Sequence, residues 1–282
     1  MKRRASKSPA RRKVARGKKN PYIKFVIIGL IVVFIGSFSY YYRDGLAYYL
    51  GFKSDKALRD AAADKRLADL RNIQILVKHD GMAVGFDVSE YQGKINWAEV
   101  DSIDAYQFEF VFIRATAGKD KVDAKFQKNW LAAKNSNLLC GAYHYYRPNE
   151  NSIEQANNFI KTVKLRPGDL PPVLDIEQLP ETQSIDSLKM GLRRWLNRVE
   201  NHYKVKPIIY SGERYYADFL KEEFAGYKFW IANYNFFVGS IDKDWLFWQF
   251  TEKGTVNGIK GNVDLNVFNG NAEALDALTI KR

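Results

Sequence analysis

The chain has 282 residues but only one cysteine and three histidines. The single cysteine, Cys140, excludes a disulfide within the chain, and its apolar surroundings, NLLCGAYHYY, are typical of a small buried residue. His79, His144 and His202 lack the close spacing of zinc ligands, and there is no cysteine pair. We therefore expect no zinc site and no cofactor, although an ion held only by oxygen atoms stays open.

Acidic residues are absent from the first 24 positions, which contain eleven Lys or Arg residues. This segment accounts for nearly all of the net charge of +12, so the rest of the chain is nearly neutral. No basic stripe remains for the phosphates of a nucleic acid to follow. We expect no nucleic-acid partner, and interpret residues 1–24 as a basic cytoplasmic tail.

Charged residues are also absent from residues 25–42, FVIIGLIVVFIGSFSYYY. As a helix this segment is about 27 Å long, close to the ~30 Å thickness of a bilayer core. The basic residues before it predict a cytoplasmic N-terminus, with the rest of the chain outside the cytoplasm in the cell envelope. A signal peptide cleaved near Ser37-Phe38-Ser39 is the alternative, but the length of both regions favours a transmembrane anchor.

The composition of residues 43–81, rich in Ala, Leu, Lys and Asp, favours a juxtamembrane helical stalk. From residue 82 to residue 282, short apolar runs alternate with spacers, three of which have helical length. This alternation favours a parallel sheet, and the number of runs favours an α/β barrel. The eight runs are MAVGFDVS, FVFIRAT, LLCGAYHYY, PPVLDIE, PIIYS, FWIANY, LFWQF and VDLNVF.

Polar residues stand at the ends of these runs, where the active sites of such barrels lie. Asp87 ends the first run, and Asp264 is less regular because it begins the eighth. The other run ends carry Asp175 and Glu177, Tyr210 and Ser211, Asn233 and Tyr234, and Gln249. We expect these side chains to gather at one end of the barrel.

Asp175 and Glu177 alternate along one strand, so their side chains should point to the same face, with Cα atoms roughly 6.5–7 Å apart. Two neighbouring carboxylates share protons unequally, so that one is an acid at neutral pH while the other stays charged. Glycoside hydrolysis needs this division. A nucleophilic serine is less well supported, because Ser211 lacks the G-x-S-x-G turn, and His144 on an aromatic strand is typical of a partly buried histidine.

With these strings in order, the chain resembles the glycoside hydrolase family 25 lysozymes of the Chalaropsis type over about residues 83–270. The match rests on GFDVSEYQGKINW, GAYHYYRP, PPVLDIE, PIIYSGERYY, FWIANY, FWQF and GNVDLNVFNG, together with FVFIRATAG. The resemblance implies an irregular TIM-like barrel of five β/α units followed by three nearly bare strands. It also implies hydrolysis of the β-1,4 bond between N-acetylmuramic acid and N-acetylglucosamine in the glycan strands of peptidoglycan.

The resemblance further implies roles for particular residues. Glu177 matches the general acid, and Asp175 matches either the nucleophile or the group that stabilises the substrate's own N-acetyl group. Asp87 and Asp264 match further acids of the cleft. Six residues fall on motif positions near the sugar, where they either stack on it or pack in the core: Tyr145, Tyr210, Trp230, Asn233, Tyr234 and Gln249.

One position departs from the family pattern. Where the family commonly has A-T-E-G, this chain has an alanine, Ala117, so an acid is missing near the cleft. Because the four acids of the motifs remain, we expect a changed substrate preference and retained catalysis. The leading hypothesis is a membrane-anchored lysozyme, and the alternative is a barrel that binds peptidoglycan without cutting it.

Overall fold

The structure, a computed structural model, describes residues 29, 31–37, 61–241 and 244–281. The chain divides into residues 1–50 and a compact unit of residues 51–282. The expected basic tail lies outside the described residues. Of the expected anchor, residues 25–42, only 29 and 31–37 are described, and they are helical. No helix within the described part of the chain is both long enough and apolar enough to span a membrane.

Eight strands of the compact unit close into a barrel, in which β1 pairs with both β3 and β10. Each of the eight predicted apolar runs forms one of these strands. Their bounds are β1 (Val84–Val88), β3 (Tyr106–Ala117), β5 (Leu139–Tyr145), β6 (Val173–Asp175), β7 (Ile208–Gly212), β8 (Lys228–Ala232), β9 (Trp245–Gly254) and β10 (Val263–Phe268).

The expectation of a parallel sheet is correct from β1 round to β9 but wrong for β10. Strand β10 runs antiparallel to both of its neighbours, β9 and β1. The loop between β9 and β10, residues 255–262, is shorter than the dozen or so residues that a parallel crossover needs, so the chain turns back on itself.

Helices follow four of the parallel strands. They are α4 (Phe126–Lys134), α5 (Ser152–Thr162), α6 (Ile185–Tyr203), and the short α7 (Glu213–Tyr215) with its continuation η3 (Tyr216–Leu220). After β1 come only two single turns, η1 (Glu90–Gln92) and η2 (Trp97–Glu99), so the first of the five expected β/α units has no α-helix. The short strands β2 (Ser102–Ile103) and β4 (Lys121–Val122) pair with β3. In the described residues no helix separates β8, β9 and β10, as the sequence predicts.

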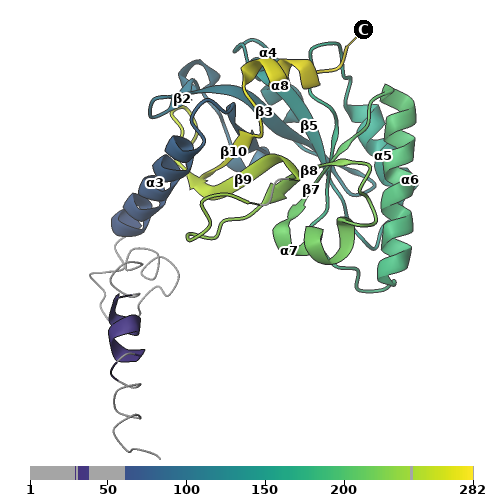
Figure 1. Cartoon of the computed structure of the whole chain (residues 1–282). Helices are drawn as coiled ribbons and strands as arrows, with labels where there is room; N and C mark the ends of the chain where they lie inside the picture. Colours follow the sequence, from purple (N-terminus) through teal and green to yellow (C-terminus); the bar gives the residue numbers. More distant parts are fainter. Residues whose placement is uncertain (1–28, 30, 38–60, 242–243, 282) are drawn as a thin grey trace, which may run out of the picture. The chain divides into compact units, whose positions relative to one another are not determined.

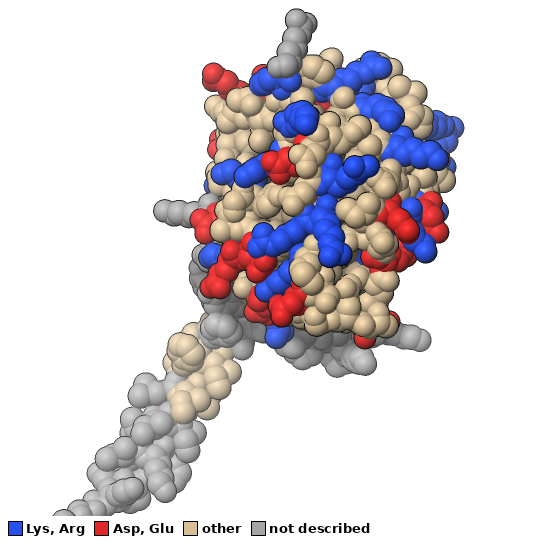
Figure 2. Space-filling model, turned by 90° about the vertical axis from the view of Figure 1, so that its right-hand side faces the viewer, with Lys and Arg blue, Asp and Glu red and all other residues tan. Residues whose placement is uncertain are grey.

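Helix α6 is amphipathic and lies along the side of the barrel (Figure 1). It begins at the N-cap Ser184, whose side chain accepts a hydrogen bond from the Ser187 backbone N–H. Its inner face is buried and includes the predicted stripe of Leu188, Leu192, Trp195, Leu196 and Val199. Figure 2 shows this side of the molecule, where Lys and Arg side chains lie among acidic and neutral ones.

The core has two layers. One layer fills the barrel interior and includes Phe110, Phe112 and Phe247, and the other lies between the barrel and the helices. Helix α8 (Ala272–Leu278) follows β10 and packs Leu275 into the interior layer. Because β10 is antiparallel, α8 lies at the end opposite the carboxyl ends of the parallel strands, and α7 lies at the other end (Figure 1).

Helix α3 (Ala61–Lys78) falls in the expected stalk, whose residues 43–60 lie outside the described part. It packs against β9, with Ile75 and Leu76 buried. The buried Arg71 guanidinium donates a hydrogen bond to the backbone oxygen of Phe250 on β9. This helix is therefore part of the same packed unit as the barrel.

Candidate active site

A cleft of about 210 Å³ lies at the carboxyl ends of the parallel strands. This is the end at which the sequence places the polar residues of the strand ends. The cleft is lined by Asp87, Tyr143, Asp175, Glu177, Tyr210, Trp230, Tyr234, Gln249, Glu252 and Asp264. All four acids of the motifs are therefore in one cleft.

Asp175 and Glu177 come from β6 and the residues directly after it. The strand ends at Asp175 and does not continue to Glu177 as expected, but its neighbours still hold the chain beyond it. The Tyr146 backbone N–H donates to the backbone oxygen of Asp175 at 2.8 Å, and the Ile176 backbone N–H donates to the backbone oxygen of Tyr210 at 3.0 Å. The Asp175 and Glu177 side chains are hydrogen-bonded to each other.

The two carboxyl groups differ in their surroundings. Asp175 is buried, while Glu177 is exposed to the cleft. Burial, and then the charge of Glu177, hold the pKa of Asp175 well above its ordinary value. Burial also raises the pKa of Glu177, but the hydrogen bond from Asp175 opposes that rise. The two carboxyl groups therefore titrate as a pair, and the proton that they hold at neutral pH belongs to both.

Asp87 and Asp264 lie directly opposite each other on the antiparallel strands β1 and β10. Asp264 is near the start of its strand, yet it reaches the cleft because β10 runs in the reverse direction. Burial raises the pKa of Asp87 to about 7, against the opposing effect of two amide hydrogen bonds. Burial, and then the charge of Asp87, raise the pKa of Asp264 to about 9.

A chain of hydrogen bonds fixes the Asp87 carboxylate. Gln249 Nε2 donates to Asp87 Oδ2 at 2.6 Å, and Asn266 Nδ2 donates to the same oxygen at 2.9 Å. Gln249 Oε1 in turn accepts hydrogen bonds from the hydroxyls of Tyr210, at 2.7 Å, and Tyr234. Because the amide has its donor toward Asp87 and its acceptor toward the tyrosines, the whole network favours Asp87 as an acceptor.

The model of the family described as glycosyl hydrolases family 25 matches residues 86–259. The chain belongs to this family. It is therefore a glycoside hydrolase, as the sequence motifs predicted.

Relatives of this family 25 enzyme cover most of its length. "Lysozyme M1" of Streptomyces globisporus is 34% identical over 209 residues, which are 69% of this chain and 70% of that protein. "Uncharacterized protein YegX" of Escherichia coli (strain K12) is 40% identical over 198 residues, which are 68% of this chain and 72% of that protein. The structure of a family 25 glycosyl hydrolase from Bacillus anthracis is similar with a TM-score of 0.64 and 31% identity, covering 71% of this chain and 95% of that one.

Four of the six residues expected near the sugar line the cleft of this family 25 barrel: Tyr210, Trp230, Tyr234 and Gln249. Of these, Trp230 packs in the core, because it is 2% exposed and its ring stacks on Phe112 at 4.7 Å. Trp230 Nε1 also donates to Asn266 Oδ1 at 2.8 Å, which supports the network around Asp87.

The other two residues are not among those that line the cleft. Tyr145 lies close to it, since burial and then the charges of Glu177 and Asp175 raise its pKa to about 12. Asn233 Nδ2 donates to the Glu213 carboxylate at 2.5 Å instead.

Sequence reasoning missed Tyr143, Asn266 and Glu252. Tyr143 precedes Tyr145 by two positions on β5, so strand alternation was a signal that could have identified it. Asn266 follows Asp264 by two positions in the same way. Glu252 had no such signal, because the pairing of β9 with β10 shifts register near Thr251.

Three other candidates lie away from the reaction chemistry. His144 is fully buried between Thr116 and Gln155, and burial lowers its pKa to about 3, so it is neutral. Ser211 Oγ donates to the backbone oxygen of Ile176 at 2.6 Å. Burial raises the pKa of the Cys140 thiol to about 12, which removes its nucleophilic character. Within the described ranges no cluster of three His, Cys, Asp or Glu side chains is placed to hold a metal ion.

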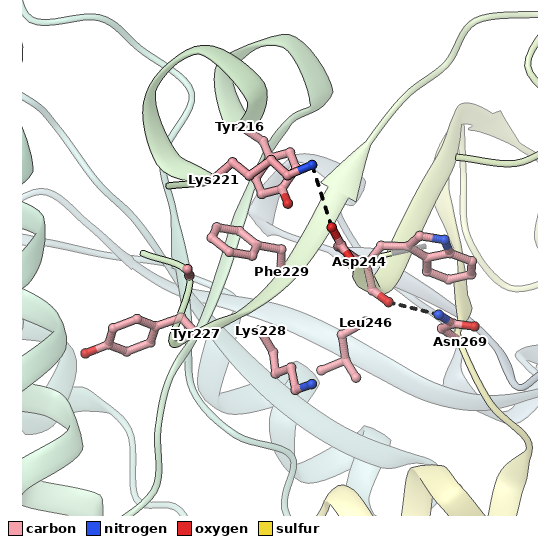
Figure 3. A pocket seen from close by; sticks show the side chains of 10 residues that line it. Tyr216, Lys221, Tyr227, Lys228, Phe229, Asp244, Leu246 and Asn269 are labelled. Carbon is pink, nitrogen blue, oxygen red and sulfur yellow. Dashed lines mark hydrogen bonds and ion pairs between the residues drawn. The ribbon is translucent and has the colours of Figure 1, made fainter. Parts of the chain in front are cut away.

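A larger cavity, of about 540 Å³, lies at the opposite end of the barrel (Figure 3). It is bordered by the first residues of β8 and β9, including Lys228 and Trp245. In Figure 3 Lys221 and Asp244 point toward each other, and their charged atoms are 3.6 Å apart. This cavity contains none of the four motif acids, so size alone does not identify the active site of this enzyme.

Proposed function

We propose that the chain is a membrane-anchored lysozyme that hydrolyses the β-1,4 bond between N-acetylmuramic acid and N-acetylglucosamine in peptidoglycan. The observation that supports this most is the pair of Asp175 and Glu177, which share a hydrogen bond in a cleft lined by further acids, among them Asp87 and Asp264. The family 25 relatives named lysozyme support the substrate class.

In this proposal Glu177 is the general acid, because it is the member of the pair exposed to the cleft. A general acid must protonate the oxygen of the leaving sugar, so it must be within reach of substrate. Asp175 and Glu177 share a proton at neutral pH, and Glu177 is the member of the pair that can deliver it to the leaving oxygen.

Asp175 is the charged partner when the shared proton is on Glu177. A buried carboxylate stabilises the positive charge that develops at the anomeric carbon more strongly than an exposed one, because little water screens it. Asp175 Oδ1 is buried and has no hydrogen-bond partner among the described residues. Its two possible roles are attack on the anomeric carbon and acceptance of the N–H of the substrate's own N-acetyl group.

Asp87 and Asp264 would position the sugar and set the local charge. The hydrogen-bond network holds Asp87 as an acceptor for sugar hydroxyls, while Asp264 is protonated at neutral pH and can donate. Tyr210, Tyr234 and Gln249 complete this wall of the cleft.

The location is part of the proposal. The basic residues 1–24 and the uncharged residues 25–42 support an anchor with a cytoplasmic N-terminus, which would put the barrel of residues 82–282 in the cell envelope. Residues 43–81 would connect the two, with α3 packed on the barrel. Peptidoglycan is within reach of an enzyme held in this way.

The experiment is digestion of purified peptidoglycan by the full-length protein, followed by mass analysis of the products. A lysozyme creates new reducing ends at N-acetylmuramic acid. Glu177→Gln should lower the rate by several orders of magnitude, because it removes the proton donor and keeps the shape of the side chain. The matched control is Glu154→Gln, an exposed acid of α5, which should cut at the wild-type rate. Wild-type protein that binds peptidoglycan without making reducing ends would support the non-catalytic alternative and overturn the proposal.

A further inference from the structure

Tyr91 is the most exposed large aromatic residue of the described barrel, with 80% of its surface accessible. It belongs to η1, the turn that follows β1, four positions after Asp87. It therefore lies at the cleft end of the barrel. A single exposed aromatic ring is ordinary on a protein surface, so the case for a ligand here depends on how this ring is held.

The ring of Tyr91 is supported from behind by a charged side chain. The guanidinium carbon of Arg114 lies 4.6 Å from the centre of the ring, in a cation–π contact. Arg114 is itself held by two carboxylates, Asp123 at 3.0 Å and Glu90 at 3.3 Å. The side chain that supports the ring is nearly buried and is held by both ion pairs.

The backbone under Tyr91 is also held in place. Ser89 and Gln92 form a capping box, in which Ser89 N–H donates to Gln92 Oε1 at 2.8 Å and Tyr91 N–H donates to Ser89 Oγ at 3.3 Å. Glu90 N–H donates to Asp123 Oδ2 at 2.9 Å. A ring that is exposed, yet fixed through both its backbone and its face, loses little conformational freedom when a ligand covers it.

Tyr91 is linked to the acid pair through Tyr145 and Arg114. Tyr145 pairs with Asp175 on β6 and with Ala117 on β3. Arg114, which contacts the Tyr91 ring, pairs with Tyr143 of the cleft wall, two positions before Tyr145 on β5.

The position where the family pattern commonly has an acid also lies in this region. Ala117 pairs with Tyr145 on β5 and with Lys121 on β4, and Lys121 bonds to Glu90 at 3.0 Å. The methyl side chain of Ala117 carries no charge and no hydrogen-bonding group, so it leaves the surface between the acid pair and Tyr91 without the acid that the family pattern has there.

We propose that Tyr91 is the stacking platform of an outer sugar subsite, on the β1 and β3 side of the cleft. The apolar face of an N-acetylhexosamine ring would lie on the face of Tyr91 that Arg114 leaves open, further along the glycan strand than the bond that is cut. This inference rests on the proposed function for the identity of the glycan. It adds a residue that binds the substrate strand away from the reacting atoms.

The test uses full-length protein carrying Glu177→Gln, so that glycan is bound without being cut, and compares peptidoglycan oligosaccharides of two and six sugar rings. Adding Tyr91→Ala should weaken binding of the six-ring glycan about tenfold and leave the two-ring glycan unchanged, because only the longer strand reaches the platform. Tyr91→Phe and Tyr91→Trp should keep the affinity, since each retains a ring. Tyr227→Ala, at the other end of the barrel, is the matched control and should bind both glycans as its parent does.

Two results would overturn the platform. One is six-ring affinity within twofold of the parent in Tyr91→Ala, and the other is an equal loss for both glycans. In the active protein, Tyr91→Ala should raise KM for long glycans and leave kcat unchanged. Absence of new reducing ends with wild-type protein would refute the proposed function, whereas the binding comparison judges the platform separately.

Discussion

The stability of the barrel should fall as pH rises, because acids of the cleft keep their protons in the folded state. Burial and neighbouring charge raise the pKa of Asp264 from an ordinary 3.8 to about 9. Between these values the unfolded chain has lost the proton and the folded chain has kept it. The stability that this proton contributes is complete below about pH 4 and is lost as pH rises toward 9.

The size of the effect follows from the shift in pKa. One retained proton changes the free energy of unfolding by about 1.36 kcal/mol per pH unit, so three units, from pH 5 to pH 8, give an upper limit of about 4 kcal/mol. Asp264 is partly exposed and interacts with the charge of Asp87, and we halve the figure for these reasons. Asp264→Asn cannot ionise, so its stability should fall by about 2 kcal/mol less than that of the wild type over this range.

The assay is urea unfolding at pH 5, 6.5 and 8, followed by tryptophan fluorescence. All 6 tryptophans lie between residues 97 and 248, so the signal reports on the barrel alone. Asp120→Asn, a change at an exposed aspartate of the β3 to β4 turn, is the matched control and should have the wild-type slope. Equal pH dependence in the wild type and in Asp264→Asn would refute the argument that burial keeps this carboxyl protonated.

Two further changes test the site and the barrel. Gln249→Leu removes a hydrogen bond that lowers the pKa of Asp87, so the pKa of Asp87 should rise above about 7. The acid side of the pH–activity profile should then move to higher pH. Release of reducing ends from pH 4 to pH 9 measures this profile, and an unchanged profile contradicts the prediction. Gly141→Ala puts a Cβ 2.2 Å from the Phe112 ring inside the barrel. It should therefore lower the free energy of unfolding by about 1–3 kcal/mol, measured by urea unfolding. An unfolding midpoint equal to that of the wild type would show that the ring moves aside freely.

Much of the barrel could be predicted because parallel strands that are covered on both sides are continuous apolar runs. All eight runs are strands, and the predicted stripe of α6 is buried. The direction of β10 could not be predicted in the same way, since a run of alternating residues reads equally well in both directions. Asp264 therefore seemed out of place at the start of its run, until the antiparallel pairing put it opposite Asp87.

The candidate site also has features that the sequence predicts and features that it does not. The types and order of its residues, among them Asp87, Asp175 and Glu177, are visible as motifs, and their places at strand ends follow from local alternation. Local patterns contain no information about burial or about partners far along the chain. Gln249 and Asp87 are 162 residues apart, and only the closed barrel joins them by a hydrogen bond.

Protonation and support were decided by the tertiary structure alone. A pKa depends on how much water and which charges surround a group, so the raised pKa of Asp175 follows from its burial in the folded barrel. The contact of the Tyr91 ring with the Arg114 guanidinium is likewise visible only in the folded structure. The motifs alone were enough to predict the family and the chemistry, because they are local in the chain. The protonation state of each acid depends on burial and charges contributed by segments that are distant in the sequence, and these segments come together only on folding.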